Sequence, residues 1–396
     1  MASELLIPTK NCGIIIDMKY AIFGGAFDPL HVEHIRIATE ARDALGLDAV
    51  VMVPTFRPPH KHSKAASFDD RLAMLKAFAA TERGILVDSI ERDLALDKSF
   101  TSDILPVLIE KYGSDGVYLI GGDSMVKFSQ WHLPEKIAAM LPIVAVRRKG
   151  YDAVDRAAEF ARTRYGANVR VVDFDCRSVS SSDLKARAAL GISLLPDVTP
   201  EVADYIGKRG LYRDYDAIVA RLKASVSERL FGHIARTAIA AVRYASQIDV
   251  DYDKAFVAAL LHDCAKQMPP LYPLSSYRTK SNAVIHQYDG AEIAKTRYGV
   301  EDTEILEAIR YHTTGKPGMS RLSQIVYVAD KLEEGRNYEG IEALRRLVRE
   351  DFDRGFLAVV EHGMQYLQNS GNPVDDLTIE CYNYYKNSGR QPMPKE

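Results

Sequence analysis

The apolar residues of this chain follow two different patterns, which meet near Arg213. Over residues 19–212, short apolar runs such as residues 50–53 alternate with stretches of helical character. After that, apolar residues recur three and four positions apart, as at Ile305 and Ile309. Apolar strands separated by helices indicate a parallel sheet covered on both faces, whereas the later spacing indicates amphipathic helices.

We therefore expect an α/β fold, with a Rossmann-like parallel-sheet domain at residues 18–212 followed by an all-α domain at residues 213–396. Residues 1–17 are expected to form an N-terminal tail. Strands are expected at residues 20–23, 49–53, 85–90, 117–120, 143–146 and 169–174. Helices in the first domain are expected at residues 34–45, 69–80, 104–111 and from about 180. Helices in the second are expected at residues 217–230, 235–246, 254–262, 291–298, 304–311, 322–332, 341–348 and 352–367.

Composition narrows the class of protein. Among 396 residues, 47% are hydrophobic and 27% charged, which is typical of a globular chain and excludes a disordered or collagen-like one. A net charge of −3 excludes a broad surface for nucleic acid or an anionic membrane, so any phosphate site must be local. No apolar run approaches the ~20 residues of a membrane span. We expect a cytoplasmic protein; a homo-oligomer is compatible with the sequence.

The four cysteines are far apart and form no CxxC pair, which argues against a zinc ribbon or a disulfide framework and fits a reducing compartment. They are Cys12, Cys176, Cys264 and Cys381.

A glycine-rich turn with two histidines follows the first expected strand, at residues 23–34. Gly24 and Gly25 let backbone N–H groups approach an anion, and the next helix adds the positive end of its dipole. His31 and His34 are three residues apart and share one face of that helix. Two imidazoles there can stabilise charge that develops on phosphate during nucleotidyl transfer. The alternative is a structural turn with two incidental histidines.

This segment resembles the GxFDPxHxGH signature of the nucleotidyltransferase superfamily. Four later segments narrow the resemblance to bacterial nicotinate-nucleotide adenylyltransferases, and it covers residues 19–212 in order. They are Pro58-Pro59-His60-Lys61, Ser99-Phe100-Thr101-Ser102-Asp103, Gly121-Gly122-Asp123 with Trp131, and Val179-Ser180-Ser181-Ser182-Asp183-Leu184-Lys185.

The resemblance implies adenylyl transfer from ATP to nicotinate mononucleotide, with Mg²⁺ on the ATP phosphates and no protein nucleophile. The implied catalytic residues are His31 and His34. The implied ATP-binding residues are Gly24, Gly25, Phe27, Asp28, His31, His34, Asp123, Ser180, Ser181 and Lys185. The implied mononucleotide-binding residues are Lys61, Thr101 and Trp131.

The second half carries histidines and aspartates at the ends of apolar helical runs. Neighbouring imidazole and carboxylate groups suit Fe, Mn or Zn, and a metal-bound water could attack a phosphoryl group. Each histidine alone would be a helix cap or a surface residue; the ordered set favours a metal site. The set comprises His233, His262-Asp263, His286, His312 and Asp330.

This half resembles the HD-domain phosphohydrolases over residues 230–336, and most closely their symmetrical bis(5′-nucleosyl)-tetraphosphatase branch. The resemblance implies cleavage of diadenosine tetraphosphate to two ADP, with iron as the expected metal and Mn or Zn as alternatives. The implied metal ligands are His233, His262, Asp263 and Asp330, with Asp263 and Lys266 as catalytic residues. The implied ligands of polyphosphate or a second metal are Arg236, Lys266, His286 and His312.

Two residues depart from the transferase pattern: Glu33 stands where that family has glycine, and Lys185 where it has arginine. These departures favour one rival hypothesis, a nucleotide-sensing module with one degenerate half. The other rival keeps both activities but changes the substrates, for instance to guanosine polyphosphates or cyclic nucleotides in the hydrolase. Both the acid and the amide mononucleotide stay open as substrates of the transferase.

Overall fold

The computed structural model of the chain describes residues 18–57, 65–95, 98, 100–148, 153–174, 179–279 and 281–388. They form two compact units, each with its own core of buried apolar side chains. The first contains Ala65–Ser181, Leu194–Leu211 and the described residues up to Arg57, and the second contains Ser182–Ser193 and the described chain from Tyr212 onward. Segment Ser182–Ser193 joins the second unit, where Asp183 accepts hydrogen bonds of 2.7 and 2.9 Å from Arg243.

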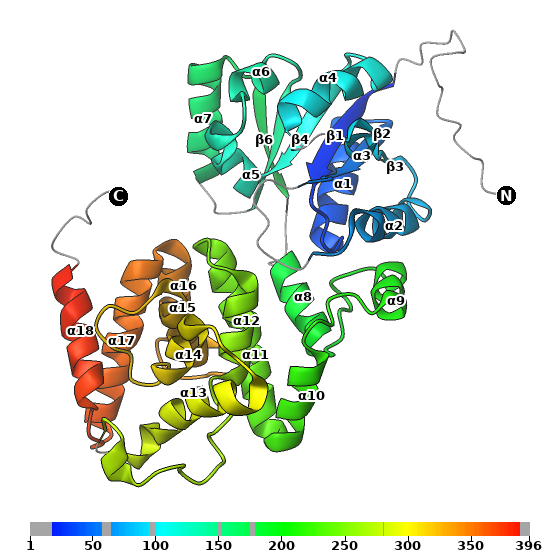
Figure 1. Cartoon of the computed structure of the whole chain (residues 1–396). Coiled ribbons are helices and arrows are strands. Elements are labelled where there is room, and N and C mark those ends of the chain that lie inside the picture. The colour runs from blue at the N-terminus through cyan, green and yellow to red at the C-terminus, as the bar shows by residue number, and fades with distance from the viewer. Residues whose placement is uncertain are drawn as a thin grey trace. The chain divides into compact units, whose positions relative to one another are not determined.

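A six-stranded sheet forms the centre of the first unit, and all of its strand pairs are parallel (Figure 1). The order is β3-β2-β1-β4-β5-β6. The strands are β1 (Tyr20–Gly25), β2 (Ala49–Pro54), β3 (Ile85–Val87), β4 (Gly116–Gly121), β5 (Ile143–Arg148) and β6 (Val169–Phe174). β2 is buried at every position, as its unbroken apolar run predicts. The α/β fold class expected for this half is confirmed.

The strand order reverses direction at β1, which pairs with β2 on one side and β4 on the other. In doubly wound sheets, ligands bind outside the carboxyl ends of the strands at such a switch point. β1 ends at Gly24-Gly25 and β4 at Gly121, so the glycine-rich turn lies at this point of the fold.

Helices cover both faces of the sheet in Figure 1. Ser67 caps α2 by accepting a 3.1 Å hydrogen bond from Asp70 N, and α1 ends where Gly46 adopts a φ of 61°, a conformation that glycine tolerates best. The helices are α1 (Val32–Leu45), α2 (Phe68–Ala79), α3 (Ile90–Leu94), α4 (Thr101–Tyr112), α5 (Gly122–Val126), the 3₁₀ turn η1 (Phe128–Gln130), α6 (Pro134–Ala138), α7 (Ala153–Tyr165) and α9 (Pro200–Arg209).

The second unit is helical throughout its described residues (Figure 1), which confirms the expected all-α class. It contains α8 (Ser181–Ala189, from Ser182), α10 (Asp216–Ser225), α11 (Glu228–Gln247), α12 (Tyr252–Leu261), the 3₁₀ turns η2 (Leu274–Ser276) and η3 (Asn282–Val284), α13 (Ile285–Tyr298), α14 (Thr303–Arg310), α15 (Arg321–Leu332), α16 (Ile341–Glu350), α17 (Phe352–Asn369) and α18 (Asp376–Ser388).

The expectation of one helix over residues 217–230 is wrong. Val226 is extended, with φ −129° and ψ 160°, and Ser227 caps a new helix by accepting a hydrogen bond from Leu230 N. The expected helix at residues 235–246 is therefore the later part of α11. A serine that can bond the backbone three residues on competes with helix continuation.

Six α-helices of the described residues were not expected from the sequence: α3, α5, α6, α7, α9 and α18. The expected strand at residues 85–90 is shorter, because β3 ends at Val87 and α3 begins at Ile90. The expected helix at residues 291–298 begins earlier, at Ile285, which places His286 in its first turn.

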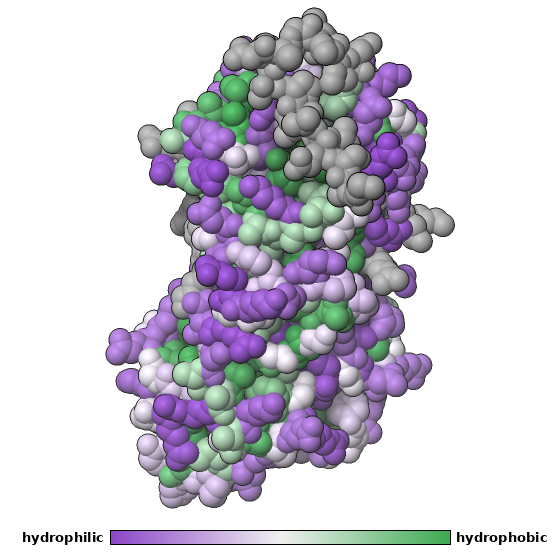
Figure 2. Space-filling view, turned by 90° about the vertical axis from the view of Figure 1, so that its right-hand side faces the viewer, coloured by the Kyte–Doolittle hydropathy of each residue, from purple (hydrophilic) through white to green (hydrophobic). Residues whose placement is uncertain are grey.

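None of the helices in the described parts of the chain is long and apolar enough to cross a membrane. On the face that Figure 2 displays, hydrophilic and hydrophobic residues are intermingled. Cys264 and Cys381 are buried free thiols, and the other two cysteines lie outside the described residues.

Candidate active sites of the two units

A cavity of about 280 Å³ opens at the switch point of the first unit. Its wall includes Gly24 and Gly25 at the end of β1, Thr101 at the start of α4, and Trp131 just after η1. Ligand cavities of roughly this size and upward bury small organic molecules, so a pyridine ring with its substituent fits the space.

Two aromatic side chains pack against Trp131, and one of them, Tyr118, also lines the cavity. The Trp131 ring lies 6.3 Å from the ring of Tyr118 and 5.5 Å from that of Phe128, measured between centroids. Tyr118 is buried and forms a hydrogen bond with Thr101, and burial raises its pKa to about 12. Thr101 is therefore held in place by a neutral phenol.

Residue His132 also lines the cavity, with its ring 4.4 Å from the Phe100 ring. Sequence reasoning assigned no role to His132, Phe100 or Tyr118. Phe100 was quoted only as part of the motif segment around Thr101, His132 only follows Trp131, and Tyr118 only lies on an expected strand.

The two motif histidines meet at the N-terminus of α1. The rings of His31 and His34 are stacked, with centroids 3.7 Å apart and planes 23° apart. Phe27 packs edge-on against His34 at 5.1 Å, and its φ of 48° is unusual for a bulky residue. A strained residue beside two stacked imidazoles is the kind of geometry found at functional loops.

Asp28 is a buried residue of the glycine-rich turn. It is 3% exposed, and its Oδ1 accepts a 3.1 Å hydrogen bond from Ala66 N. Buried Arg71 donates to the carbonyl oxygens of Ala26 and Thr55 at 2.7 and 2.8 Å. Asp28 and Arg71 thus hold the glycine-rich turn in shape.

Glu33 is also buried, with 2% of its surface exposed. Among the described residues, neither carboxylate oxygen has a hydrogen-bond partner, and Oε1 lies 4.0 Å from Nη1 of Arg36. The replacement of the family's glycine by Glu33 therefore places a carboxylate inside the first unit. The nearby positive charge is that of Arg36, one helical turn further along α1.

The other expected transferase residues are distributed as follows. Asp123 is on α5 at the end of β4, and Ser180 and Ser181 stand at the start of α8. Lys185 belongs to the second unit, where its ammonium lies 4.8 Å from the centroid of the Tyr252 ring. Lys61 lies outside the described residues.

In the second unit, all six expected histidines and aspartates converge. Nε2 of His233 lies 3.0 Å from Asp330 Oδ1 and 3.3 Å from His262 Nε2. Asp263 bridges to the remaining pair: its Oδ1 lies 3.3 Å from Nε2 of His286 and of His312. Two groups have the spacing of metal ligands, and His262 is common to both: His233, His262 and Asp330, and His262, Asp263 and His312.

Hydrogen bonds fix the tautomers of these imidazoles. Nδ1 of His262 lies 2.6 Å from the carbonyl oxygen of Ala259, and Nδ1 of His312 lies 2.8 Å from that of Ile309. Since a carbonyl only accepts, Nδ1 carries the proton and the Nε2 lone pair faces inward. Lone pairs then face carboxylate oxygens, and within the described part of the chain Asp263 Oδ1 has no hydrogen bond of good geometry. Acceptors that face acceptors fit a bound cation.

The electrostatics agree with this arrangement. Burial opposes ionisation of Asp263 and Asp330, but the neighbouring His262 and Lys331 outweigh it and hold both pKa values well below their usual range. Burial lowers the pKa of His312 to about 4, so this imidazole is neutral at pH 7. An ionised Asp263, an ionised Asp330 and a neutral His312 are in the protonation states that metal ligands require. Burial opposes protonation of His233, but its hydrogen bonds with Asp330 and Glu333 outweigh burial and raise its pKa.

Comparison with known families agrees with both halves. Residues 22–187 match the Cytidylyltransferase-like family, and residues 230–335 match the HD domain. An HD domain implies a divalent metal, which the His/Asp groups described above can hold.

One relative covers nearly the whole chain. A Mycoplasma genitalium protein named "probable nicotinate-nucleotide adenylyltransferase/Ap4A hydrolase" is 31% identical over 365 residues, which is 89% of this chain and 98% of that protein. The chain belongs to the nicotinate-nucleotide adenylyltransferase/Ap4A hydrolase family. It is accordingly an enzyme with a nucleotidyltransferase half and an HD-hydrolase half.

Other relatives match one half of this bifunctional family. A "probable nicotinate-nucleotide adenylyltransferase" from Exiguobacterium sibiricum is 35% identical over 200 residues, 49% of this chain and 99% of that protein. A crystal structure from Clostridium acetobutylicum, titled as a "predicted HD superfamily hydrolase involved in NAD metabolism", is 32% identical and covers 44% of this chain and 97% of its own, with a TM-score of 0.40.

Glu333 is a residue of the HD half that sequence reasoning missed. It follows Asp330 by three positions, and its Oε1 lies 3.2 Å from Nδ1 of His233. Its Oε2 accepts a 2.6 Å hydrogen bond from Nε of Arg236. A Cβ on Gly335 would clash with that guanidinium, so glycine at this position lets Arg236 keep its place beside Glu333. Arg236 thus orients Glu333, which orients His233, the outer-shell arrangement usual at metal sites.

Glu333 should make a pH-dependent contribution to stability. Burial opposes its ionisation, but hydrogen bonds from His233 and Arg236 outweigh it and lower its pKa from 4.5 to about 2. A depressed carboxylate stabilises the folded state above the unfolded pKa, and this contribution is lost as pH falls through the folded one. The stability difference between wild type and Glu333→Gln should be constant above about pH 4.5 and shrink towards pH 2, measured by urea unfolding.

The exposed neighbour Glu334 provides the control, because its side chain is 69% exposed. Glu334→Gln should differ from wild type far less at every pH. A Glu333→Gln difference that stays the same from pH 6 to pH 2 would contradict the prediction.

Proposed function

We propose that the first half transfers the adenylyl group of ATP to nicotinate mononucleotide, giving nicotinic acid adenine dinucleotide and pyrophosphate. The observation that carries this proposal is one cavity lined both by Gly24 and Gly25 at the end of β1 and by Trp131. A triphosphate at the N-terminus of α1 and a pyridine ring at Trp131 would then belong to one site. The family membership and the curated relatives' names support the same reaction.

Positioning and charge stabilisation account for the proposed chemistry. The mononucleotide phosphate is already ionised, so it attacks the α-phosphorus of ATP without a protein nucleophile. The backbone at Gly24 and Gly25, with the stacked pair His31 and His34, would bind the triphosphate and stabilise charge on the departing pyrophosphate. Mg²⁺ would arrive with ATP.

Trp131 should control the affinity for the pyridine nucleotide. Stacking of a base on an aromatic side chain contributes roughly 1–3 kcal/mol, so Trp131→Ala should raise KM for nicotinate mononucleotide about tenfold or more. KM for ATP should stay within about twofold, since the ring would touch only the pyridine nucleotide. Trp131→Phe serves as the conservative variant and should recover most of the loss in steady-state assays. An equal rise of both KM values would assign Trp131 to the core instead.

For the second half, we propose metal-dependent symmetrical hydrolysis of diadenosine tetraphosphate to two ADP. The observation that carries this proposal is the sharing of His262 between two groups of metal ligands. His233, His262, Asp263 and Asp330 would hold the metal, with iron proposed and manganese or zinc as alternatives. A bound metal supplies positive charge that polarises a phosphoryl oxygen and promotes ionisation of water.

The chain's own residues would handle the polyphosphate. Lys266 Nζ lies 2.8 Å from Asp263 Oδ2 and 42% of its side chain is exposed, so it can reach a phosphate oxygen beside the ligand. His286 and His312 face Asp263 from the other side and would bind polyphosphate or a second metal. Arg236 donates its hydrogen bond to Glu333. Its proposed role is therefore to position Glu333 rather than to bind phosphate.

A product assay on the intact chain tests both halves. ATP, Mg²⁺ and nicotinate mononucleotide should give pyrophosphate and the dinucleotide, and diadenosine tetraphosphate should give ADP only. Absence of pyrophosphate would favour the sensing module. The amide mononucleotide, guanosine polyphosphates and cyclic nucleotides, assayed in parallel, identify the preferred substrates. Metal analysis of anaerobically purified protein should find a transition metal.

We propose that residues 18–212 form the transferase domain and residues 213–396 the hydrolase domain. We also propose a cytoplasmic location, because ATP is the substrate and the buried Cys264 and Cys381 are free thiols.

A further inference from the structure

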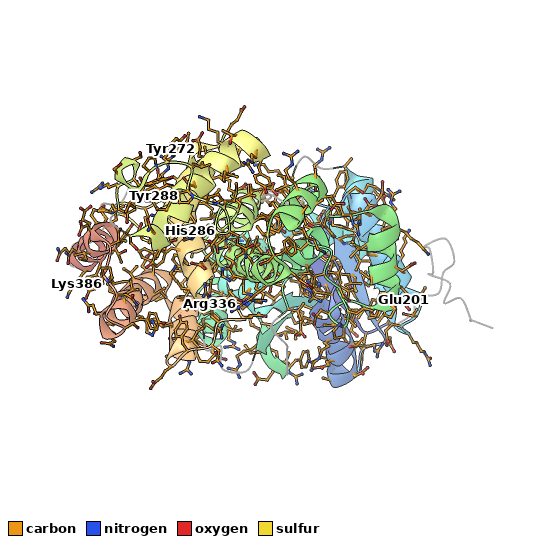
Figure 3. The ribbon with its side chains drawn as sticks, turned by 90° about the horizontal axis from the view of Figure 1, so that it is seen from below. Glu201, Tyr272, His286, Tyr288, Arg336 and Lys386 are labelled. Carbon is orange, nitrogen blue, oxygen red and sulfur yellow. The ribbon has the colours of Figure 1, made fainter. Side chains whose placement is uncertain are left out.

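Asp330 carries two cationic neighbours that neither sequence pattern nor family resemblance brought to attention. Its Oδ2 lies 2.6 Å from Nζ of Lys331, and its Oδ1 lies 2.8 Å from Nη2 of Arg336. The two side chains are 27% and 39% exposed, whereas that of Asp330 is 6% exposed. Lys331 and Arg336 therefore contact a buried carboxylate at the same time as they are partly exposed to solvent. Figure 3 labels His286, which lies in the first turn of α13, and Arg336, which lies in the loop between α15 and α16.

Positive charge is already in excess around this centre. Asp263, Asp330 and Glu333 are the carboxylates, and each is paired with a lysine or arginine. The cations are Lys266, Lys331, Arg336 and Arg236. Among the described residues, four cations thus face three carboxylates, and a divalent metal would add two more positive charges. A partly buried site with an excess of positive charge favours binding of a ligand that carries several negative charges.

The guanidinium of Arg336 is held so that one end stays available. Its Nε donates a 3.0 Å hydrogen bond to the backbone carbonyl of Asp330, and Nη2 donates to the carboxylate. Among the described residues, Nη1 has no hydrogen-bond partner. Arg345 supports the loop from behind by donating to the carbonyls of Glu333 and Arg336 at 2.6 and 3.2 Å. A fixed guanidinium with an open edge suits a phosphate oxygen.

We propose that Arg336 and Lys331 form a phosphate-binding pair that holds the polyphosphate chain of the hydrolase substrate beside Asp330. This inference rests on the hydrolase function proposed above. Lys266 contacts Asp263 in the same way, so cations would meet the polyphosphate next to both ligand carboxylates. A linear polyphosphate cleaved at its middle bond needs charge compensation on both sides of that bond.

The rival explanation is structural: Arg336 and Lys331 could serve Asp330 only as counter-ions. Metal content separates the two roles. A counter-ion holds Asp330 in place, so its loss should release metal. A phosphate-binding residue touches the ligand, so its loss should weaken nucleotide binding at unchanged metal content.

The test uses the full chain with its metal and measures calorimetric binding of ADP, which carries half of the substrate's polyphosphate. All proteins carry His34→Ala, so that the transferase site contributes little. Arg336→Gln should weaken ADP binding at least about tenfold, and Lys331→Gln should act in the same direction. Arg336→Lys should recover part of the affinity. The matched control Lys254→Gln removes a cation paired with Asp302 and Glu304 and should change nothing.

Steady-state hydrolysis without the His34 substitution gives the second measurement, in which Arg336→Gln should raise KM more than it lowers kcat. Unchanged ADP affinity in both Arg336→Gln and Lys331→Gln would overturn the proposal. A loss of metal from these variants in proportion to their loss of ADP affinity would also overturn the proposal, because it would show that Arg336 and Lys331 act as counter-ions of Asp330. If wild type does not hydrolyse diadenosine tetraphosphate, the hydrolase function fails, while the ADP measurement still decides the role of Arg336.

Discussion

Replacing His262 with alanine should lower diadenosine tetraphosphate hydrolysis about 10³-fold or more and leave adenylyl transfer unchanged. His262 is fully buried and its Nε2 belongs to both groups of candidate metal ligands. Its Nδ1 is engaged by Ala259, so no other atom of the ring can replace Nε2. Loss of this imidazole should therefore reduce metal content as well as turnover. Metal analysis and the two product assays measure these effects.

His362→Ala provides the matched control in the same unit. Its ring stacks on Tyr338 with centroids 4.9 Å apart and takes part in neither ligand group. This variant should keep both metal and hydrolysis. Because removal of a buried ring also costs stability, His262→Gln should be measured beside His262→Ala. Retention of metal and turnover by both His262 variants would remove the hydrolase assignment.

The fold could be predicted because its burial pattern is simple. β2 is buried at every position, so its apolar residues form an unbroken run that identifies a central parallel strand. α7 was not expected, although its buried residues Val154, Ala158 and Ala161 have the spacing of one face of a helix. Two of these three residues are alanines, which do not form the long apolar run that marks β2. The break at Ser227 depends on one capping hydrogen bond, which a periodic pattern does not register.

The candidate sites could be predicted only where a motif marks them. His262 and Asp263 were recognisable as a pair, but nothing in the sequence indicated that Asp263 lies 3.3 Å from both His286 and His312. No role was predicted for Glu333 or Arg336 because single charged residues after a helix are ordinarily solvated. Their roles depend on distances across the unit, such as that between His233 and Glu333, which lie 100 residues apart in the chain.

Replacing His34 with alanine should lower kcat of adenylyl transfer by about 10²–10³, the usual effect of removing one donor that stabilises developing charge. His34 stacks on His31 at the N-terminus of α1, where the helix dipole also favours negative charge. KM for nicotinate mononucleotide should change little, because that nucleotide would occupy the cavity around Trp131. Hydrolysis of diadenosine tetraphosphate should stay at the wild-type rate.

His132→Ala tests whether this effect is specific to phosphate chemistry. His132 lines the cavity with its ring against Phe100, so its loss should raise KM for nicotinate mononucleotide and leave kcat close to wild type. A lower kcat in His34→Ala and a higher KM in His132→Ala would distinguish charge stabilisation by His34 from substrate binding by His132. A His34→Ala variant with normal kcat would show that the α1 N-terminus does not bind the reacting phosphates, and the stacked pair would then be a structural element of the turn.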